Sequence, residues 1–332
     1  RDSGFTLFYM GINLGALSAM LVCGYLGQTY GWKYGFGLAG VGMLLGLVTF
    51  LRGRSWLLDA GEPPCHELLV KKLGPLSREY WIYVGGFIGV ACSWVLIQRP
   101  IAVGWLLGLT SFIAVVGIVI YSFLYCSPAE RNRHLIVLYL TAVSVVFWTF
   151  FEQAGTSMAL FTERNVDKAL FGFEMQASQM GFLNPAFIIL CAPFFSLFWD
   201  RLAKLGFEPS TTTKFGLGII QVGIGFIFLV IGGHYADAMG QVALVWLVLA
   251  YLLHTTGELS LSPVGLSMVT KLSIGRLVGL MMGVWFLSSA GAHYIAGEIA
   301  KFASVDEVGG QSIDSTQSLS IYLEVFFTLG WI

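Results

Sequence analysis

The hydrophobic residues of this chain are collected into long apolar blocks that short polar segments separate. A helix needs about 20 mostly apolar residues to cross a lipid bilayer, and most of these blocks are close to that length. The blocks predict ten membrane helices, at residues 5–25, 34–51, 80–97, 101–125, 135–161, 181–199, 215–233, 242–272, 277–302 and 320–332. The last block is too short to cross a bilayer, and we expect it to be cut off.

Composition supports an all-α membrane protein. The chain of 332 residues is 56% hydrophobic and 11% charged, whereas soluble domains are about 25% charged. Its net charge of −1 gives no basic field that would attract nucleic acid. The five cysteines lack the spacing of a metal site or redox pair, so we interpret them as packing residues.

The positive charges predict how the helices are oriented. Thirteen of the 18 Lys and Arg residues lie in one alternating set of polar segments, and five lie in the other set. Cytoplasmic loops of membrane proteins are enriched in Lys and Arg. We therefore expect the first helix to run from the cytoplasm outward. The two longest polar segments, 52–79 and 303–318, are then cytoplasmic and external, and neither resembles a domain.

A few polar side chains interrupt the apolar blocks. Asn13, Glu152 and Asn184 lie in three different predicted helices, while His254 and Glu258 lie four residues apart in the eighth. Residues at this spacing share one face of a helix. Gln221 and His293 are interpreted as isolated residues with structural roles.

Pro263 follows Glu258 in the same predicted helix. Proline has no N–H, so the carbonyl of Leu259 would lose its helical partner about one turn beyond Glu258. A kinked helix with a free carbonyl beside a carboxylate predicts the wall of a cavity, not a surface that faces lipid.

The two glutamates that lie within predicted membrane helices, Glu152 and Glu258, carry the functional interpretation. No Lys or Arg lies deep within a predicted span to pair with them, since Lys271 and Lys301 lie at the very ends of theirs. Desolvation disfavours the charged form of a carboxyl, so such a group can take up and release a proton during a transport cycle. The glutamates therefore favour a proton-coupled carrier, with a neutral, hydrogen-bonded structural pair as the alternative.

Several blocks of sequence resemble the proton-coupled oligopeptide transporter (POT) family. They are FTLFYMGINLGAL (5–17), FWTFFEQAGTSMALFTERN (147–165), HTTGELSLSPVGLSMVTKL (254–272) and GRLVGLMMGVWFLSSA (275–290). The resemblance implies the major facilitator fold and proton-driven import of di- and tripeptides by alternating access. It implies no cofactor apart from the coupling proton.

The resemblance also implies how the chain is divided. About ten of an expected fourteen membrane helices are present, and the family's first four helices have no counterpart here. The implied parts are 1–57, a remnant of the N-terminal bundle; 58–79, a cytoplasmic loop; 80–126, two extra linker helices; 127–134, a cytoplasmic linker; and 135–332, the C-terminal bundle with a truncated last helix. We do not expect these residues to transport peptide by themselves.

The resemblance assigns roles to seven residues. Glu258 would receive the amino terminus of the peptide, and Glu152 would take part in proton coupling together with Glu258. Glu163 would pair with an arginine of the N-terminal half to close an external gate. The remaining substrate-binding residues would be Asn13, Asn184, Trp285 and Ser289.

A short peptide is a zwitterion, so its ammonium end needs a negatively charged partner and its carboxylate end needs a positively charged one. Glu258 suits the ammonium end, whereas no cation lies deep within a predicted span to bind the carboxylate. We expect the family's first and fourth helices to supply that cation. The expected location is the cytoplasmic (inner) membrane, and the sequence does not fix an oligomeric state.

Other functions stay open at this point. The first alternative is a carrier of the same family for nitrate or a drug-like anion, and another is a sensor that does not transport. A membrane-embedded enzyme is disfavoured, because the HxxxE spacing of His254 and Glu258 has no second ligand at helical spacing.

Overall fold

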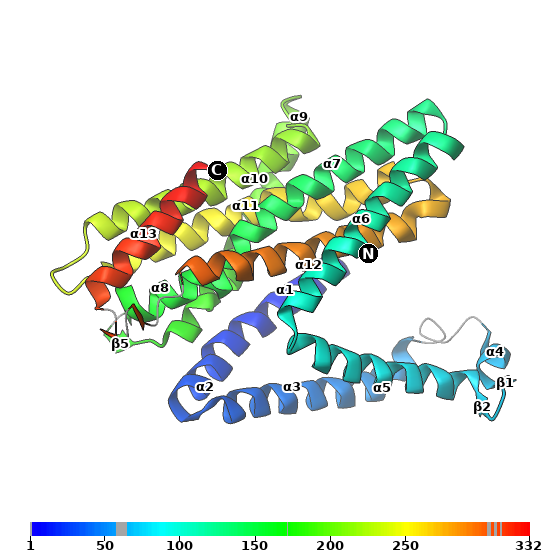
Figure 1. Cartoon of the computed structure of the whole chain (residues 1–332), viewed down its shortest axis with the longest axis horizontal. Helices are drawn as coiled ribbons and strands as arrows, with labels where there is room; N and C mark the ends of the chain where they lie inside the picture. Colours follow the sequence, from blue (N-terminus) through cyan, green and yellow to red (C-terminus); the bar gives the residue numbers. More distant parts are fainter. Residues whose placement is uncertain (1, 58–64, 171, 304–306, 309–310, 313) are drawn as a thin grey trace. The chain divides into compact units, whose positions relative to one another are not determined.

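The computed structural model of the chain describes residues 2–57, 65–170, 172–303, 307–308, 311–312 and 314–332 (Figure 1). These residues are almost entirely helical, as the apolar blocks predicted. The α-helices are α1 (Asp2–Ser18), α2 (Gly24–Tyr30), α3 (Trp32–Gly53), α4 (His66–Val70), α5 (Arg78–Ile97), α6 (Pro100–Tyr125), α7 (Pro128–Phe151), α8 (Ser157–Asn165), α9 (Leu183–Lys204), α10 (Thr211–His234), α11 (Leu244–Leu272), α12 (Val278–Ala303) and α13 (Ser315–Trp331).

Shorter helical turns join several of these helices. A π-helical turn, η1 (Ala19–Cys23), lies between α1 and α2. The 3₁₀ turns are η2 (Arg54–Leu57), η3 (Glu152–Gly155), η4 (Ala177–Phe182) and η5 (Gly275–Leu277). Eight two-residue strands complete the elements, namely β1 (Lys72–Leu73), β2 (Leu76–Ser77), β3 (Val166–Asp167), β4 (Ala169–Leu170), β5 (Phe173–Glu174), β6 (Val242–Ala243), β7 (Glu307–Val308) and β8 (Gln311–Ser312).

Nine helical segments of the described residues are long and apolar enough to cross a membrane. They correspond to the first nine predicted blocks. The tenth block is α13, which has only 17 residues. The prediction of an all-α membrane chain is therefore confirmed, with nine of the ten predicted blocks long enough to span a bilayer among the described residues.

The chain forms two compact units. Residues 37–110 make up one unit, and residues 1–36 with 111–332 make up the other. In the smaller unit, β1 and β2 form an antiparallel hairpin whose turn contains Gly74 at φ 69°, and the indole N–H of Trp81 donates to the carbonyl of Leu73 over 2.9 Å. Pro63 and Pro64 lie outside the described residues. The five-part division of the chain stays a prediction.

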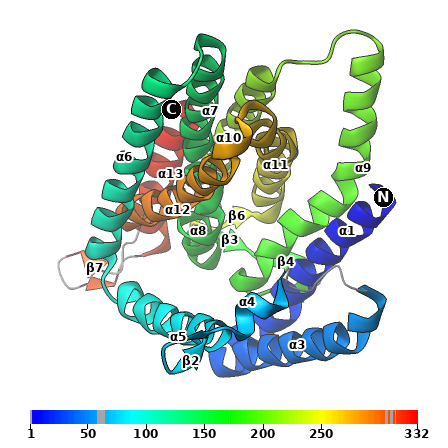
Figure 2. The same cartoon turned by 90° about the vertical axis from the view of Figure 1, so that its right-hand side faces the viewer.

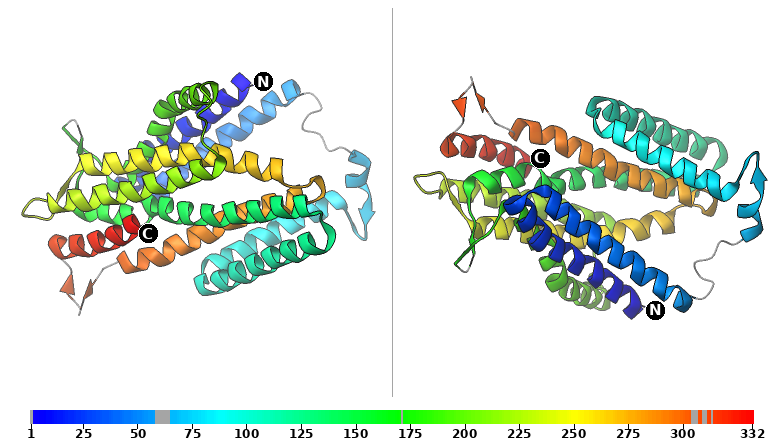
Figure 3. Two further views of the ribbon diagram at one scale, coloured as in Figure 1. Left: turned by 90° about the horizontal axis from the view of Figure 1, so that it is seen from above. Right: turned by 90° about the horizontal axis from the view of Figure 1, so that it is seen from below.

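Helices α7, α10, α11, α12 and α13 of the larger unit run alongside one another (Figure 3), and its core lies among them and α8. Phe147, Phe161, Phe226 and Phe326 are fully buried there. Phe161 and Phe226 both contact Phe326, with ring centroids 5.3 and 5.6 Å apart. These edge-to-face and stacked contacts join α8 and α10 to α13.

Glycines bring α10 and α11 into close contact. A Cβ atom on Gly257 would lie 2.8 Å from the carbonyl oxygen of Gly218, and one on Gly218 would lie 3.0 Å from the carbonyl oxygen of Gly257. Only glycine leaves room for this approach of the two backbones, which is a common way of packing membrane helices. Gln221 bonds to Leu217 in α10 and to Ser260 in α11, in keeping with its predicted structural role.

The segment α1–η1–α2 packs on α9 and η4 within the larger unit (Figure 2). Ser178 donates to the carbonyl of Gly24 over 3.0 Å, and Gln179 donates to the carbonyl of Leu21 over 2.9 Å. The π-helical turn has one residue more than a regular α-helical turn, and such turns release backbone carbonyls from the helical ladder. Side chains of η4 therefore bind carbonyls in and just after this turn.

Candidate functional site

Glu258 and Asn184 form the centre of the candidate site. Asn184 is the second residue of α9, and its amide donates to the Glu258 carboxylate over 3.0 Å and to the Thr255 hydroxyl over 3.1 Å. Thr255 in turn donates to the carbonyl of Tyr251, one turn earlier in α11. An amide orients a carboxylate and leaves its charge in place, so a negatively charged Glu258 could still attract a cation.

Glu152 lies where the seventh membrane helix of the resemblance is interrupted. The predicted span 135–161 lies within one helical segment, Pro128–Asn165, but the regular helix is interrupted, because α7 ends at Phe151 and α8 begins at Ser157. The 3₁₀ turn η3 joins them. Glu152 is the first residue of that turn, and its side chain is 30% exposed.

Gln153 stabilises this interruption. Its side chain is fully buried and donates to the carbonyls of Thr149 and Ala296, while its amide oxygen accepts from Ser157 over 2.7 Å. These bonds satisfy polar groups that the broken helix would otherwise leave unpaired. They also join the turn to α12.

His293 is the partner of Glu152 that the sequence did not reveal. Its Nδ1 lies 3.4 Å from a carboxylate oxygen of Glu152, so the prediction of an isolated His293 is wrong. The two residues lie on different helices, and the apolar periodicity of one helix does not determine which residues of another helix it meets. A carboxyl and an imidazole at this distance can exchange a proton directly or through a water.

A cavity of about 290 Å³ joins several of these groups. Glu152, Asn184 and His254 line it from three helical segments, and Tyr251 and Met20 complete parts of its wall. The described residues that line it do not include Trp285, Ser289 or Glu258. The structure therefore places Glu152 and Asn184 at a common cavity, and Glu258 is hydrogen-bonded to Asn184 without lining the cavity itself.

The other predicted substrate-binding residues lie on α1 and α12. Asn13 is 6% exposed. The indole of Trp285 is buried against Gly265 of α11, where a Cβ atom would lie 2.5 Å from the ring. Ser289 is half-buried one turn after Trp285. Their roles in binding stay predictions, as does the kink at Pro263, whose side chain lies outside the described residues.

Glu163 lies at the end of α8, next to the contact between α2 and η4. Its carboxylate accepts from the side-chain amide of Gln28 over 2.9 Å. The oxygen of the same amide accepts from the backbone N–H of Ser178 over 3.1 Å. One residue, Gln28, thus joins α2 to both α8 and η4, and its interior position in α2 gave no sign of this from sequence. The expected arginine partner of Glu163 stays a prediction.

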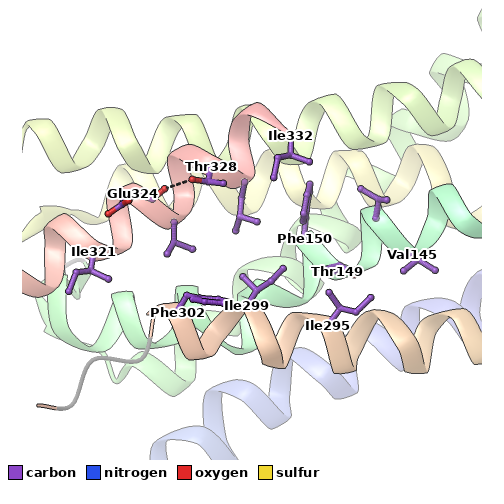
Figure 4. A pocket seen from close by; sticks show the side chains of 13 residues that line it. Val145, Thr149, Phe150, Ile295, Ile299, Phe302, Ile321, Glu324, Thr328 and Ile332 are labelled. Atoms are coloured by element: carbon purple, nitrogen blue, oxygen red, sulfur yellow. Dashed lines mark hydrogen bonds between the residues drawn. The ribbon is translucent and has the colours of Figure 1, made fainter. Parts of the chain in front are cut away.

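A larger cavity of about 670 Å³ lies between α7, α12 and α13 (Figure 4). Its walls are mostly aliphatic and aromatic, with Ile295, Ile299 and Phe302 on the α12 side. Glu324 and Thr328 contribute the polar groups from α13. Because a zwitterion requires several converging polar partners, the smaller cavity beside Glu152 and Asn184 suits a peptide better.

The sequence model that describes the POT family matches residues 1–314. This chain belongs to the POT family. Dipeptide and tripeptide permease A of Pectobacterium carotovorum is 35% identical over 332 residues, which cover 99% of this chain and 63% of the relative. Peptide transporter YePEPT of Yersinia enterocolitica is also 35% identical, over 93% of this chain and 63% of its own length.

A solved structure of a POT peptide transporter mutant in complex with alafosfalin superposes with a TM-score of 0.76. The two chains are 32% identical, and the match covers 100% of this chain and 66% of the other. The POT chain described here therefore has the major facilitator fold and is a multi-pass membrane protein. It spans about two thirds of the length of these relatives.

Proposed function

We propose that the complete protein is a symporter that imports di- and tripeptides together with protons. The observation that carries this proposal is the Glu258–Asn184 pair beside a cavity that Glu152 also lines. An anion oriented by an amide fits a peptide ammonium, and a second carboxyl beside a histidine fits proton transfer. Membership of the family, and relatives named as peptide permeases, support this assignment.

The remaining residues take roles around this pair. Asn13, Trp285 and Ser289 contact the peptide, and Glu163 helps to close the outer ends of the helices. The peptide carboxylate binds a cation that lies outside these 332 residues. The protein resides in the inner membrane, with the cation-rich loops in the cytoplasm and the first helix running outward, as the positive-inside rule requires.

The cycle begins when a proton from outside neutralises the Glu152 carboxyl and the peptide ammonium meets Glu258. The outer helix ends then close around Glu163, the inner ends open, and the proton leaves. The peptide follows. A charged carboxylate is unfavourable in a low-dielectric site, and a bound proton or a bound ammonium removes this cost. Proton binding and peptide binding therefore shift the same equilibrium between the outward-open and inward-open states.

Uptake into proteoliposomes tests this function. The complete protein should accumulate labelled dialanine when the outside is acidic, and unlabelled dialanine should compete whereas nitrate should not. Glu258→Gln should abolish uptake because the amide cannot counter an ammonium charge. The matched variant Glu174→Gln, at an exposed position in β5, should transport normally.

Three results would contradict the proposal. Undiminished uptake by Glu258→Gln would remove the binding role of that residue. Competition by nitrate without competition by dialanine would indicate a carrier for another substrate, and an absence of all uptake would indicate a sensor.

A further inference from the structure

His254 has an imidazole ring whose two nitrogens are in different situations. The side chain is 1% exposed, and Nε2 lies 3.2 Å from the backbone carbonyl oxygen of Val222. A carbonyl only accepts hydrogen bonds, so Nε2 carries the hydrogen. The neutral ring then presents an unprotonated Nδ1, which is an acceptor.

The ring is held in one orientation by α10. A Cβ atom on Gly225 would lie 2.6 Å from Cδ2 and 2.7 Å from Nε2 of His254, so the Cδ2–Nε2 edge faces this glycine. The ring of Phe226 packs edge-on, with centroids 4.8 Å apart. Nδ1 is on the opposite side of the imidazole and therefore points away from α10.

The imidazole of His254 belongs to the wall of the 290 Å³ cavity, and Nδ1 is on the side of the ring away from Gly225. His254 lines that cavity together with Glu152 and Asn184, and Nδ1 is buried without a hydrogen-bond partner among the described residues. Nearly all buried polar atoms in proteins are hydrogen-bonded, so an unpaired one requires an explanation. A fixed acceptor on a cavity wall is suited to a ligand that donates.

An ammonium group is the donor that the surroundings favour. Glu258 lies one helical turn after His254 on the same face, and Asn184 both lines the cavity and binds the Glu258 carboxylate. An ammonium has three N–H donors and one positive charge. A single carboxylate neutralises that charge, and a neutral imidazole accepts another N–H without adding a second negative charge to a desolvated site.

We propose that Nδ1 of His254 accepts a hydrogen bond from the terminal ammonium of the substrate. This inference rests on the proposed function and adds a specificity residue to it. His254 would select substrates by the number of N–H donors on the terminal nitrogen, whereas Glu258 selects by charge. A substrate that keeps the charge and loses donors is then recognised by Glu258 alone.

Two substitutions separate the two nitrogens. His254→Gln places an amide N–H near the position of Nε2, which keeps the bond to Val222 and removes the acceptor at the position of Nδ1. His254→Asn places an amide oxygen near the position of Nδ1, which keeps that acceptor and removes the bond to Val222. The probes are dialanine, with three N–H donors, and its N,N-dimethyl derivative, with the same charge and one donor.

The measurement is competition against labelled dialanine in proteoliposomes that contain the complete protein. The wild type should prefer dialanine to the dimethyl derivative. A hydrogen bond to a charged group corresponds to about a tenfold change in affinity, so His254→Gln should lose roughly that much for dialanine and little for the derivative. His254→Asn should keep the preference and unfold at a lower temperature.

If His254→Gln still prefers dialanine to the dimethyl derivative as strongly as the wild type does, the proposal is overturned. An equal loss of affinity for both probes would overturn it too, and that is the result expected if Nδ1 binds only a water. Should His254→Gln fail to fold, a lost preference in His254→Asn would overturn it equally. Failure of the proposed function looks different, because the wild type itself would then not take up dialanine.

Discussion

At the scale of single residues, the two membrane glutamates have different partners. The carboxylate of Glu258 accepts a hydrogen bond from the amide of Asn184, and an amide cannot neutralise its charge. The carboxylate of Glu152 lies 3.4 Å from the imidazole of His293, which can take up its proton. Glu258 is therefore suited to hold a cationic ligand, and the Glu152–His293 pair is suited to pass a proton. His254 is a third case, since its neutral ring can accept a hydrogen bond without a change in charge.

Substitutions at Glu152 and His293 should separate coupling from binding. Glu152→Gln in the complete protein should abolish dialanine uptake driven by a proton gradient, because the amide cannot carry the proton. Peptide counterflow, which needs no net proton movement, should survive. His293→Gln should weaken gradient-driven uptake in the same direction and less severely. Both rates can be measured in one proteoliposome preparation, and an equal loss of both would contradict a coupling role.

At the scale of helices, sequence predicted the lengths better than the interruptions. Apolar runs identify spans because a bilayer demands a minimum length, and this requirement does not depend on neighbouring helices. The break at Glu152 depends on Gln153, which bonds to Ala296 across the bundle. The π-helical turn Ala19–Cys23 likewise depends on side chains of η4. No pattern within one helix reports such bonds.

For the candidate site too, the residues within single helices could be predicted from sequence, and the contacts between helices could not. Glu258, Asn184 and Glu152 could be selected because polar groups in apolar helices are few, and the resemblance grouped them. His293 and Gln28 were missed because each gains its partner from a distant helix. Helical spacing orders residues along one face, and it does not say which face of another helix lies opposite.

The glycine contact between α10 and α11 should limit the stability of these helices. Gly257→Ala would place a methyl group 2.8 Å from the Gly218 carbonyl oxygen, so the two backbones must separate. Overpacking of this kind costs about 1–3 kcal/mol. Thermal unfolding in detergent should begin several degrees lower. Gly216→Ala in α10 is the matched control, since a Cβ atom there meets no described atom within 4 Å, and an equal effect of both would contradict this account.

At the scale of the whole molecule, the proposed transport cycle requires that the two ends of the helices open in turn. At one end, Gln28 of α2 donates to Glu163 of α8 and accepts from the backbone N–H of Ser178 in η4, and we expect these contacts to hold that end closed. Each hydrogen bond contributes about 0.5–1.5 kcal/mol, so a few of them can set the balance between open and closed states.

Loss of the Gln28 contacts should favour opening at this end. Gln28→Leu in the complete protein removes two hydrogen bonds, and a cysteine introduced at Ala177 should then react several times faster with a membrane-impermeant thiol reagent added outside. Thr29→Val, at the neighbouring exposed position of α2, is the matched control. Equal labelling of both proteins would mean that Gln28 does not hold this end closed.

The π-helical turn Ala19–Cys23 also determines the direction in which α2 faces. Each residue of an α-helix advances the chain by about 100° around the axis. Deletion of a single residue within the turn would restore a regular helix and rotate Gly24 and Gln28 away from Ser178 and Glu163. A single inserted residue therefore determines which face of α2 points toward η4 and α8. Two relatives that differ only by that residue would have nearly the same hydropathy profile and different contacts between α2, α8 and η4.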